Sequence, residues 1–418
     1  MNGFPNRNGS GNFFYLHCDC GYQEEMHMND FSFQNTTKVF FGKEALSHIS
    51  DEAVRYGRRI LLVYGGRSVK ATGIYDRVVS ELRKKDLELF DYDLVKPNPR
   101  HTDINTGGRM CRENGIDLLI AVGGGSAIDS AKAIAALAKA DTENCWDLVV
   151  AKKPITEALP LFAIPTMAST GSEMDASCVI SNLETEQKTG YNGPALRPKV
   201  SFLDPTNTFT VPSYQTACGA VDIMSHTIDT KYFSRDDKMD MLYRMMDEHV
   251  KTVVKWGPVA YREPENYEAR ANLLWAASWA LNSFMTCGVR QLPSVHAMEH
   301  ELSACYDLVH GHGIAILMPR WMRYILNEET APQIARMAYE VYDADRNLNT
   351  MEAAEFAIAS TEKLFFETLG LKSRLSEVGI DSSRFEEMAK NACGEKGVIY
   401  GFVPLKPEDV KKIYEMCL

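Results

Sequence analysis

The segment AVGGGSAIDSAKAIAALA (121–138) brings together a buried strand, a cluster of glycines and the start of a helix. The apolar run ends in Gly123, Gly124 and Gly125, and Ser126 is placed to cap a helix rich in Ala and Ile. Backbone N–H groups and the positive end of the helix dipole then face whatever lies beyond the strand, which favours a pyrophosphate. The spacing is not G-x-G-x-x-G, and a plain tight turn also needs glycine. This loop alone leaves both interpretations open.

Further apolar runs on either side of this segment alternate with helical patterns. They are RRILLVYGG (58–66), IDLLIAVGGGS (116–126) and LPLFAIPT (159–166). Such alternation is typical of parallel strands joined by crossover helices. After LDPTNTFTVP (203–212) the pattern becomes helical almost throughout. We therefore expect an α/β, Rossmann-like dinucleotide-binding domain over residues 28–208 and an all-α domain over 209–418. Residues 1–27 lack periodicity and are predicted to be a disordered extension.

Two more loops follow predicted strands, GGRSVKATG (65–73) and IPTMASTGSE (164–173). In an open parallel sheet, ligands bind beyond the carboxyl ends of the strands, so three such ends rich in glycine and hydroxyl groups favour a dinucleotide. Loop 65–73 has no acidic residue for an adenosine ribose and offers Arg67, Ser68 and Lys70 instead, which favours NADP(H) over NAD(H). The alternative is that Arg67 and Lys70 merely solvate a surface turn.

Histidines and one aspartate recur at helical spacing in the second half of the chain. Asp222 and His226 lie four residues apart, His296 and His300 repeat that spacing, and His310 follows beside glycines. A carboxylate and several imidazoles suit a divalent transition metal such as iron(II) or zinc, with a coordination position open for a substrate. For any single histidine, a hydrogen-bonded structural role remains the alternative.

Composition excludes several classes of partner. The chain has 418 residues, 45 of them Lys or Arg and 56 Asp or Glu, so its formal charge of −11 disfavours nucleic acid. No apolar stretch is long enough for a membrane span and no secretory signal is recognisable, so we expect a cytoplasmic protein that does not bind membranes. The cysteines are scattered and are expected to be reduced. Cys18 and Cys20, with His17, are a second and weaker metal-site candidate.

The motifs together resemble the iron-containing (group III) alcohol dehydrogenases, and most closely their butanol dehydrogenase and NADPH-dependent aldehyde reductase branch. The similarity covers about residues 29–418 and rests on the GGGSxxD loop, on Asp222-x-x-x-His226, and on H-x-x-x-H followed by a histidine fourteen residues after the first. Further matches are YGGRSVKATG, VKPNP (95–99), TGSE (170–173), YEARANLLWAA (267–277) and HELSACYDLVHG (300–311). The implied fold is the dehydroquinate synthase-like fold of this family.

The resemblance also implies roles for individual residues. It implies a metal site made by Asp222, His226, His296 and His310, with Asp222 and His296 essential for catalysis, and it implies that His300 lies near the nicotinamide while His312 is not a ligand. It implies cofactor contacts by Gly65, Gly66, Ser68, Asn98, Gly124, Gly125, Ser126, Asp129, Thr166, Thr170 and Lys188. A homodimer is expected on the same ground. Arg67 replaces a glycine common in the branch, and the leader up to His27 has no counterpart.

The expected reaction is hydride transfer between NADP(H), or alternatively NAD(H), and a primary alcohol or its aldehyde. Fe2+, or alternatively Zn2+, would stabilise the negative charge that develops on the carbonyl oxygen, and His300 is a candidate for carrying the proton. A glycerol dehydrogenase, a dehydroquinate synthase of the same fold and a non-redox metallohydrolase are the alternatives. Large side chains near the metal motifs, at spacing that also suits a core, are Trp275, Trp279, Phe284, Met285 and Met298.

Overall fold

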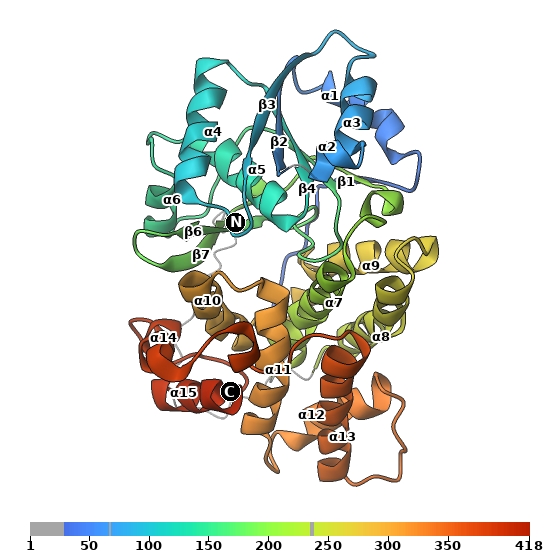
Figure 1. Ribbon diagram of the computed structural model, residues 1–418, viewed down its shortest axis with the longest axis vertical. Helices are drawn as coiled ribbons and strands as arrows, with labels where there is room; N and C mark the ends of the chain where they lie inside the picture. The colour runs from blue at the N-terminus through green and yellow to red at the C-terminus, as the bar shows by residue number, and fades with distance from the viewer. Residues whose placement is uncertain (1–28, 67, 235–237) are drawn as a thin grey trace, which may run out of the picture.

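The computed structural model describes residues 29–66, 68–234 and 238–418. The extension over 1–27, the candidate site at His17, Cys18 and Cys20, and the side chain of Arg67 lie outside these residues. An α/β half occupies the top of the view in Figure 1 and a helical half the bottom. The expected fold class, a parallel sheet followed by a helical part, is confirmed.

Six parallel strands form the central sheet in the order β1-β8-β5-β4-β2-β3. The inner strands are continuous apolar runs because helices cover both of their faces; Ile60 through Tyr64 of β2, for example, are fully buried. The strands are β1 (Lys38–Phe41), β2 (Arg59–Gly65), β3 (Glu88–Val95), β4 (Leu118–Gly123), β5 (Leu161–Pro165) and β8 (Val200–Leu203).

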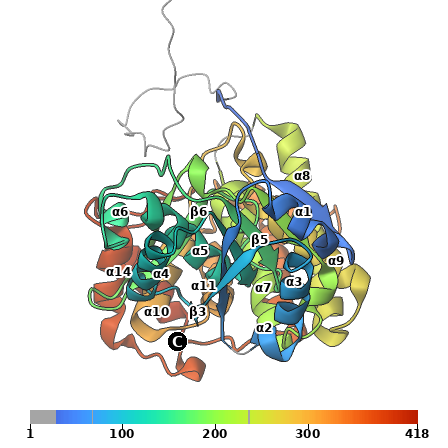
Figure 2. The same cartoon turned by 90° about the horizontal axis from the view of Figure 1, so that it is seen from above.

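Two layers of helix enclose the sheet, as the view from above shows (Figure 2). Side chains of α4 and α5 pack on one face against Leu61 and Val63, while α1 and α3 pack on the other against Ile60 and Leu62. The elements of this half are η1 (Ala45–His48), α1 (Ile49–Ala53), α2 (Ser68–Ala71), α3 (Ile74–Leu82), α4 (His101–Glu113), α5 (Gly125–Lys139), α6 (Trp146–Val150), η2 (Pro194–Leu196) and η3 (Pro205–Thr208).

An antiparallel hairpin interrupts the parallel pattern between β5 and β8. It consists of β6 (Ser177–Asn182) and β7 (Gln187–Asn192), and β7 lies against α10 of the helical half. The sequence pattern did not separate this hairpin from the crossover connections. Its position carries Lys188, on β7, toward the helical half.

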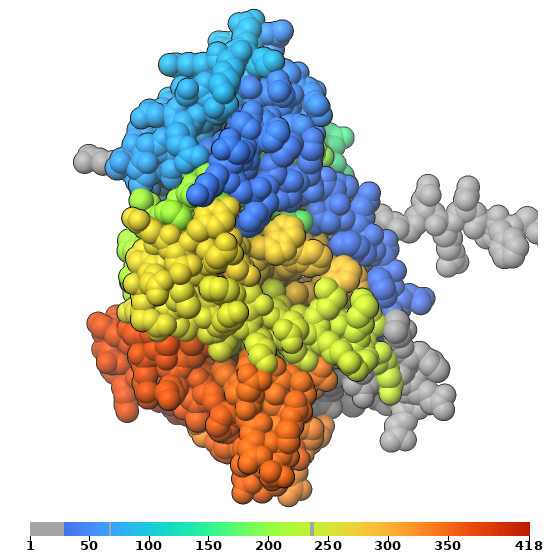
Figure 3. Space-filling view, turned by 90° about the vertical axis from the view of Figure 1, so that its right-hand side faces the viewer, coloured from blue at the N-terminus to red at the C-terminus, as the bar shows by residue number. Residues whose placement is uncertain are grey.

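The helical half is built around one large apolar cluster that includes the buried Trp321. The view in Figure 3 shows the first described residues, in blue, running down beside α8 and α9, in yellow-green and yellow. Among the described residues, none of the helices is both long and apolar enough to cross a membrane. The helical elements are α7 (Ser213–Thr227), the π-helix η4 (Ile228–Tyr232), α8 (Asp240–Arg262), α9 (Tyr267–Ala280), η5 (Phe284–Thr286), α10 (Val295–Tyr306), α11 (His310–Ile325), α12 (Ala331–Glu340), α13 (Thr350–Glu362), the π-helix η6 (Lys363–Thr368), η7 (Ser376–Val378), η8 (Ser382–Arg384), α14 (Phe385–Cys393) and α15 (Pro407–Met416).

Candidate functional site

The order in which strands are added to the sheet reverses between β2 and β4, which are parallel neighbours although β3 separates them in sequence. Tyr64 pairs with Val122, so the glycine loops that follow the two strands start side by side at the carboxyl edge of the sheet. Ligands of open α/β sheets bind at such a reversal. The predicted contacts lie on these loops or at the adjoining ends of the strands and helices: Gly65, Gly66, Ser68, Gly124, Gly125 and Ser126.

The start of α5 differs from expectation by one residue. The helix begins at Gly125 with Gly124 as its N-cap, so Ser126 lies in the first turn and the expectation that it caps the helix is wrong. Gly125 fits in this first turn because it has no side chain: a Cβ there would lie 2.5 Å from Thr170 Cγ2. The N-cap makes no side-chain hydrogen bond, which leaves the helix N-terminus open to an anion.

Asp129 lies on α5 just below this N-terminus, but its carboxylate is already engaged. Oδ1 accepts a hydrogen bond from Ser172 Oγ at 2.6 Å and Oδ2 accepts one from the Val179 N–H at 3.0 Å. Burial raises the pKa of Asp129 to about 6. These contacts hold the loop after β5 and the hairpin against α5. Asp129 therefore supports the predicted nucleotide site through its neighbours. In the same loop, the Thr166 N–H donates to the Gly123 carbonyl at 3.0 Å.

Two predicted cofactor residues reach across to the helical half. Asn98 Nδ2 donates to Asp307 Oδ1 at 2.7 Å, and Lys188 Nζ lies 3.7 Å from Glu299 Oε2. Lys188 and Glu299 are both buried side chains, so this ion pair is shielded from solvent. The predicted nucleotide site and the helical half are therefore directly connected.

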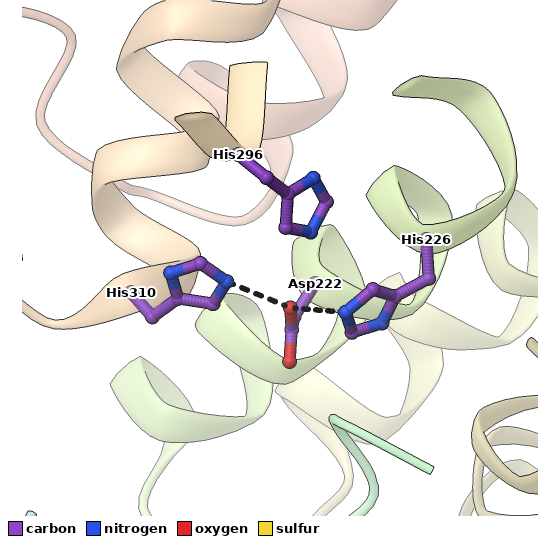
Figure 4. A group of neighbouring side chains, drawn as sticks. All are labelled: Asp222, His226, His296 and His310. Atoms are coloured by element: carbon purple, nitrogen blue, oxygen red, sulfur yellow. Dashed lines mark ion pairs between the residues drawn. The ribbon is translucent and has the colours of Figure 1, made fainter. Parts of the chain in front are cut away.

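The four predicted metal ligands come together from three helices (Figure 4). Asp222 and His226 lie one turn apart on α7, His296 lies on α10, and His310 is the first residue of α11. One ligand atom from each lies within 4.8 Å of the others. The Asp222 Oδ1 atom is 3.6 Å from His226 Nε2 and 3.7 Å from His310 Nε2. The loop after β5 also reaches this cluster, since Ser169 Oγ donates to Asp222 Oδ2 at 2.5 Å.

The donor set fits a divalent cation. Asp222 Oδ1 is buried and receives no hydrogen bond from the described residues, although three imidazoles surround it. Burial, with the nearby cations Lys231 and Lys188 adding to it, holds the pKa of His226 and of His310 well below the usual range, so both rings are neutral. Neutral imidazole nitrogens and a buried carboxylate oxygen without a donor are what a bound transition metal requires.

Two buried carboxylates contact the Nδ1 atoms of two of these histidines, the ring nitrogens that face away from the cluster. The sequence did not predict either carboxylate. Asp229 Oδ2 lies 2.8 Å from His296 Nδ1, and Glu299 Oε2 contacts His310 Nδ1. Asp222, His226 and Asp229 are spaced i, i+4, i+7 along one helical face, so this spacing was a usable signal. Nothing in the sequence indicates that Glu299, on α10, faces a histidine on α11.

The two remaining histidines of this region, His300 and His312, differ in whether their ring nitrogens are already hydrogen-bonded within the described residues. His300 is half-buried with its ring centroid 5.7 Å from that of His310, and burial together with Lys188 holds its pKa well below the usual range. It also forms a smaller cluster with Glu299 and His310. His312, by contrast, has both ring nitrogens engaged, Nδ1 with Tyr214 Oη at 3.0 Å and Nε2 with the Lys372 carbonyl at 3.0 Å.

The large apolar side chains near the metal motifs are packed against one another. Trp275, Trp279 and Phe284 form a row of edge-to-face contacts, and Met298 is buried in the helical core. Met285 is buried beside the ligand-bearing helix, where Thr227 Oγ1 donates to its sulfur at 3.6 Å. The cysteines among the described residues are free thiols.

Comparisons with known proteins agree with this geometry. The model of the iron-containing alcohol dehydrogenases matches residues 36–205, and that of the C-terminal part of the same family matches residues 216–418. The chain is 44% identical to NADH-dependent butanol dehydrogenase A of Clostridium acetobutylicum over 93% of this chain and 99% of the relative. It is 34% identical to the NADPH-dependent aldehyde reductase YqhD of Escherichia coli over 87% of this chain and 92% of that protein.

A solved structure is also similar to this chain over nearly its full length. The crystal structure of an NADH-dependent butanol dehydrogenase A from Thermotoga maritima superposes with a TM-score of 0.88 at 34% identity, covering 94% of this chain and 99% of that one. Both halves of the chain and the order of their motifs are thus shared with these enzymes. The chain belongs to the iron-containing alcohol dehydrogenase family.

Proposed function

We propose that this protein is a metal-dependent alcohol dehydrogenase and aldehyde reductase, which transfers a hydride between a nicotinamide cofactor and a primary alcohol or its aldehyde. One observation carries the proposal: within the part of the chain that the structure describes, Asp222 Oδ1 is buried among three imidazoles without a hydrogen-bond donor, and the loop after β5 contacts the same carboxylate. The names of the relatives give the substrate class, a small apolar alcohol such as butanol.

Asp222, His226, His296 and His310 would hold one divalent cation, Fe2+ or alternatively Zn2+. When bound, the cation supplies a Lewis acid for the substrate oxygen and the cofactor supplies the hydride. The protein contributes a net charge that favours this chemistry, because three neutral imidazoles and one carboxylate leave a dication positive. Ser169 Oγ and Asp229 Oδ2 contact ligand side chains, and three of the four ligand residues are buried, which limits the screening of their charge by water.

The two glycine loops and the N-terminus of α5 would hold the cofactor, with Thr166, Thr170 and Lys188 on the side that faces the helical half. His300 is the proposed carrier of the proton to or from the substrate oxygen. Its neutral imidazole can accept a proton on one nitrogen and donate one from the other. It lies beside His310 but is not needed to complete the four-residue cluster.

We propose NADH as the preferred reductant and NADPH as the poorer one. The loop sequence by itself favours NADP(H), but Lys70 Nζ lies about 5 Å from the rings of both Tyr64 and Tyr75, and Tyr75 Oη donates to Asp91 at 2.8 Å. Asp91 and Asp93 of β3 act on Tyr64 at the end of β2 and raise its pKa, after the larger effect of burial. Negative charge beside the loop disfavours a 2′-phosphate, and two relatives at 44% and 43% identity are named NADH-dependent.

A homodimer is proposed as the assembled form, as the family resemblance implies. Light scattering on the purified protein tests this, with a mass of twice 46.9 kDa expected and a mass of 46.9 kDa contradicting it.

The experiment that tests the function is a turnover screen with apoprotein reconstituted separately with Fe2+ and Zn2+. Aldehydes with NADH or NADPH, and alcohols with NAD or NADP, are followed by nicotinamide absorbance. We expect net oxidation of NADH by butyraldehyde-sized substrates, and loss of that rate in Asp222→Asn. The matched control is His249→Gln, a buried histidine that bonds Thr227 Oγ1 and the Ala276 carbonyl instead of the cluster. Absence of any net change in absorbance across the panel would favour a synthase-like or non-redox reaction.

A further inference from the structure

Asp229 is a fully buried carboxylate beside the candidate metal centre. It lies on the π-helix η4, which directly continues the ligand-bearing helix α7, and it follows His226 by three residues. Short π-helical segments inside helices often occur at functional sites. No lysine or arginine forms a direct ion pair with it among the described side chains, although the buried Lys231 lies close enough to attract it; its direct partners are hydrogen-bond donors.

Among the described residues, Asp229 makes four hydrogen bonds, all of them to the start of α10. Oδ1 accepts from the backbone N–H groups of Ser294, at 2.9 Å, and Val295, at 3.0 Å. Oδ2 accepts from the backbone N–H of His296 at 2.9 Å and contacts His296 Nδ1 at 2.8 Å. One carboxylate on the helix that carries two ligands therefore binds both the backbone and the ring of the third ligand.

These contacts determine which nitrogen of His296 can act as a ligand. A carboxylate is only an acceptor, so the ring must carry its proton on Nδ1 in order to bond Oδ2. The lone pair is then on Nε2, the nitrogen that lies on the side of Ser225 Oγ, at 3.5 Å, and of the other ligands (Figure 4). Stacking of the His226 and His296 rings, with centroids 5.0 Å apart, adds to this fixed orientation.

The three histidines differ in this respect. Asp229 contacts the outer nitrogen of His296 and Glu299 that of His310, whereas His226 Nδ1 is buried without a partner in the described part of the chain. Glu299 also contacts Ser303 Oγ and Lys188 Nζ, whereas the hydrogen-bond partners of Asp229 in the described chain all lie at the start of α10. Of the two carboxylates, Asp229 is thus the one dedicated to a single ligand.

We propose that Asp229 is a positioning residue for the metal centre, which fixes His296 in its ligating tautomer and sets α10 against α7. The inference rests on the proposed metal site. A purely structural role, as an N-terminal cap of α10, would leave the affinity of the folded protein for metal unchanged.

The test compares two isosteric variants in the full-length chain, Asp229→Asn and Asp247→Asn. Asp247 is also a buried carboxylate of the helical half, but its partners are Tyr232 Oη and Arg336. In Asp229→Asn, an NH2 group replaces one of the two oxygens, each of which accepts two hydrogen bonds. If this NH2 group donates to His296 Nδ1, the ring must carry its own proton on Nε2, the nitrogen that would bind the metal. Cobalt(II) binding to the chelator-treated apoproteins is followed by its visible absorption.

We expect the cobalt(II) dissociation constant to rise about 10- to 100-fold in Asp229→Asn and to stay at the wild-type value in Asp247→Asn. Equal affinity in the two folded variants would overturn the inference. If the wild-type protein itself binds no cobalt(II), the proposed metal site fails instead, so the two failures are distinguishable.

A second measurement needs no folded Asp229 variant. Long-range ¹⁵N–¹H correlation spectra of the wild-type apoprotein report the tautomer of His296, which is assigned by the signals that disappear in His296→Gln. We expect the proton on Nδ1. A proton on Nε2 would contradict the inference.

Discussion

The hydroxyl of Ser169 donates a 2.5 Å hydrogen bond to Oδ2 of Asp222, so the loop after β5 of the α/β half binds a predicted metal ligand of the helical half. Because the same loop contributes Thr166 and Thr170 to the predicted nucleotide site, the two candidate sites share one segment of backbone. The candidate metal site and the predicted nucleotide site are thereby connected through one loop.

This contact predicts a graded effect of Ser169→Ala. Removing a hydrogen-bond partner of a metal ligand typically costs about 10- to 100-fold in metal affinity, so the affinity should fall by roughly tenfold or more. The dissociation constant for zinc, measured by competition with a chelating dye, checks this. The matched control is Ser177→Ala, which removes a hydroxyl that donates to Asp175 Oδ2 at 2.6 Å. Equal affinities in the two variants would contradict a role for Ser169 at the cluster.

Gly125→Ala should destabilise the protein because the new Cβ meets the side chain of Thr170. Overpacking of this kind typically costs about 1–3 kcal/mol in the free energy of unfolding. The penalty should shrink when the substitution is made in a Thr170→Ala background, since the two closest contacting atoms, Cγ2 and Oγ1, are then gone and only Cβ remains, at 3.1 Å. Urea unfolding of the four proteins in this cycle measures the coupling, and strictly additive effects would show that the close approach of α5 and the loop is not real.

Asp93→Asn should improve the use of NADPH. Removal of one partly screened negative charge beside loop 65–73 is worth on the order of 1 kcal/mol, or about fivefold in kcat/KM for NADPH relative to NADH. Asp86→Asn is the control, because Asp86 is exposed at the opposite, amino end of β3, where it pairs with Arg58. An unchanged cofactor ratio in Asp93→Asn would argue against the placement of the adenosine ribose beside β3.

Lys188→Met should weaken both sites. The variant removes a predicted cofactor contact and leaves Glu299 buried without its cation, whereas Lys188→Arg retains the charge. We expect the KM for NADH to rise and metal affinity to fall in Lys188→Met, with partial recovery of both in Lys188→Arg. If only the KM changes, the ion pair with Glu299 does not support His310.

The general plan of the fold was predictable because it depends on local pattern. Strands buried on both faces read as continuous apolar runs, and glycines mark the points where β2 and β4 turn into helices. The hairpin β6–β7 was not predicted, because its two strands are short and lie outside the main sheet, where β6 has a single bridge to Arg100 among the described residues. The start of α5 at Gly125 was also missed. The first turn lies so close to Thr170 that only glycine fits there, and this approach joins residues that are distant in sequence.

Some residues of the candidate site could be predicted from the sequence, while others depend on how distant elements pack. Asp222 and His226 share a helical spacing, and His296 and His310 were placed by family resemblance; the structure brings all four together, while their ligation of a metal stays a prediction. The partners Ser169, Asp229 and Glu299 depend on how α7, α10, α11 and the loop after β5 pack. Of these, only Asp229 left a trace in the sequence, through its spacing from His226.

The central claim is that these four side chains hold a catalytic cation, and metal analysis combined with turnover tests it most directly. We predict one equivalent of divalent metal per chain in the wild-type protein, loss of aldehyde reduction after chelation, and recovery when Fe2+ or Zn2+ is restored. Asp222→Asn should bind far less metal and fail to recover. Full turnover by metal-free protein, or normal metal content and rate in Asp222→Asn, would contradict the account.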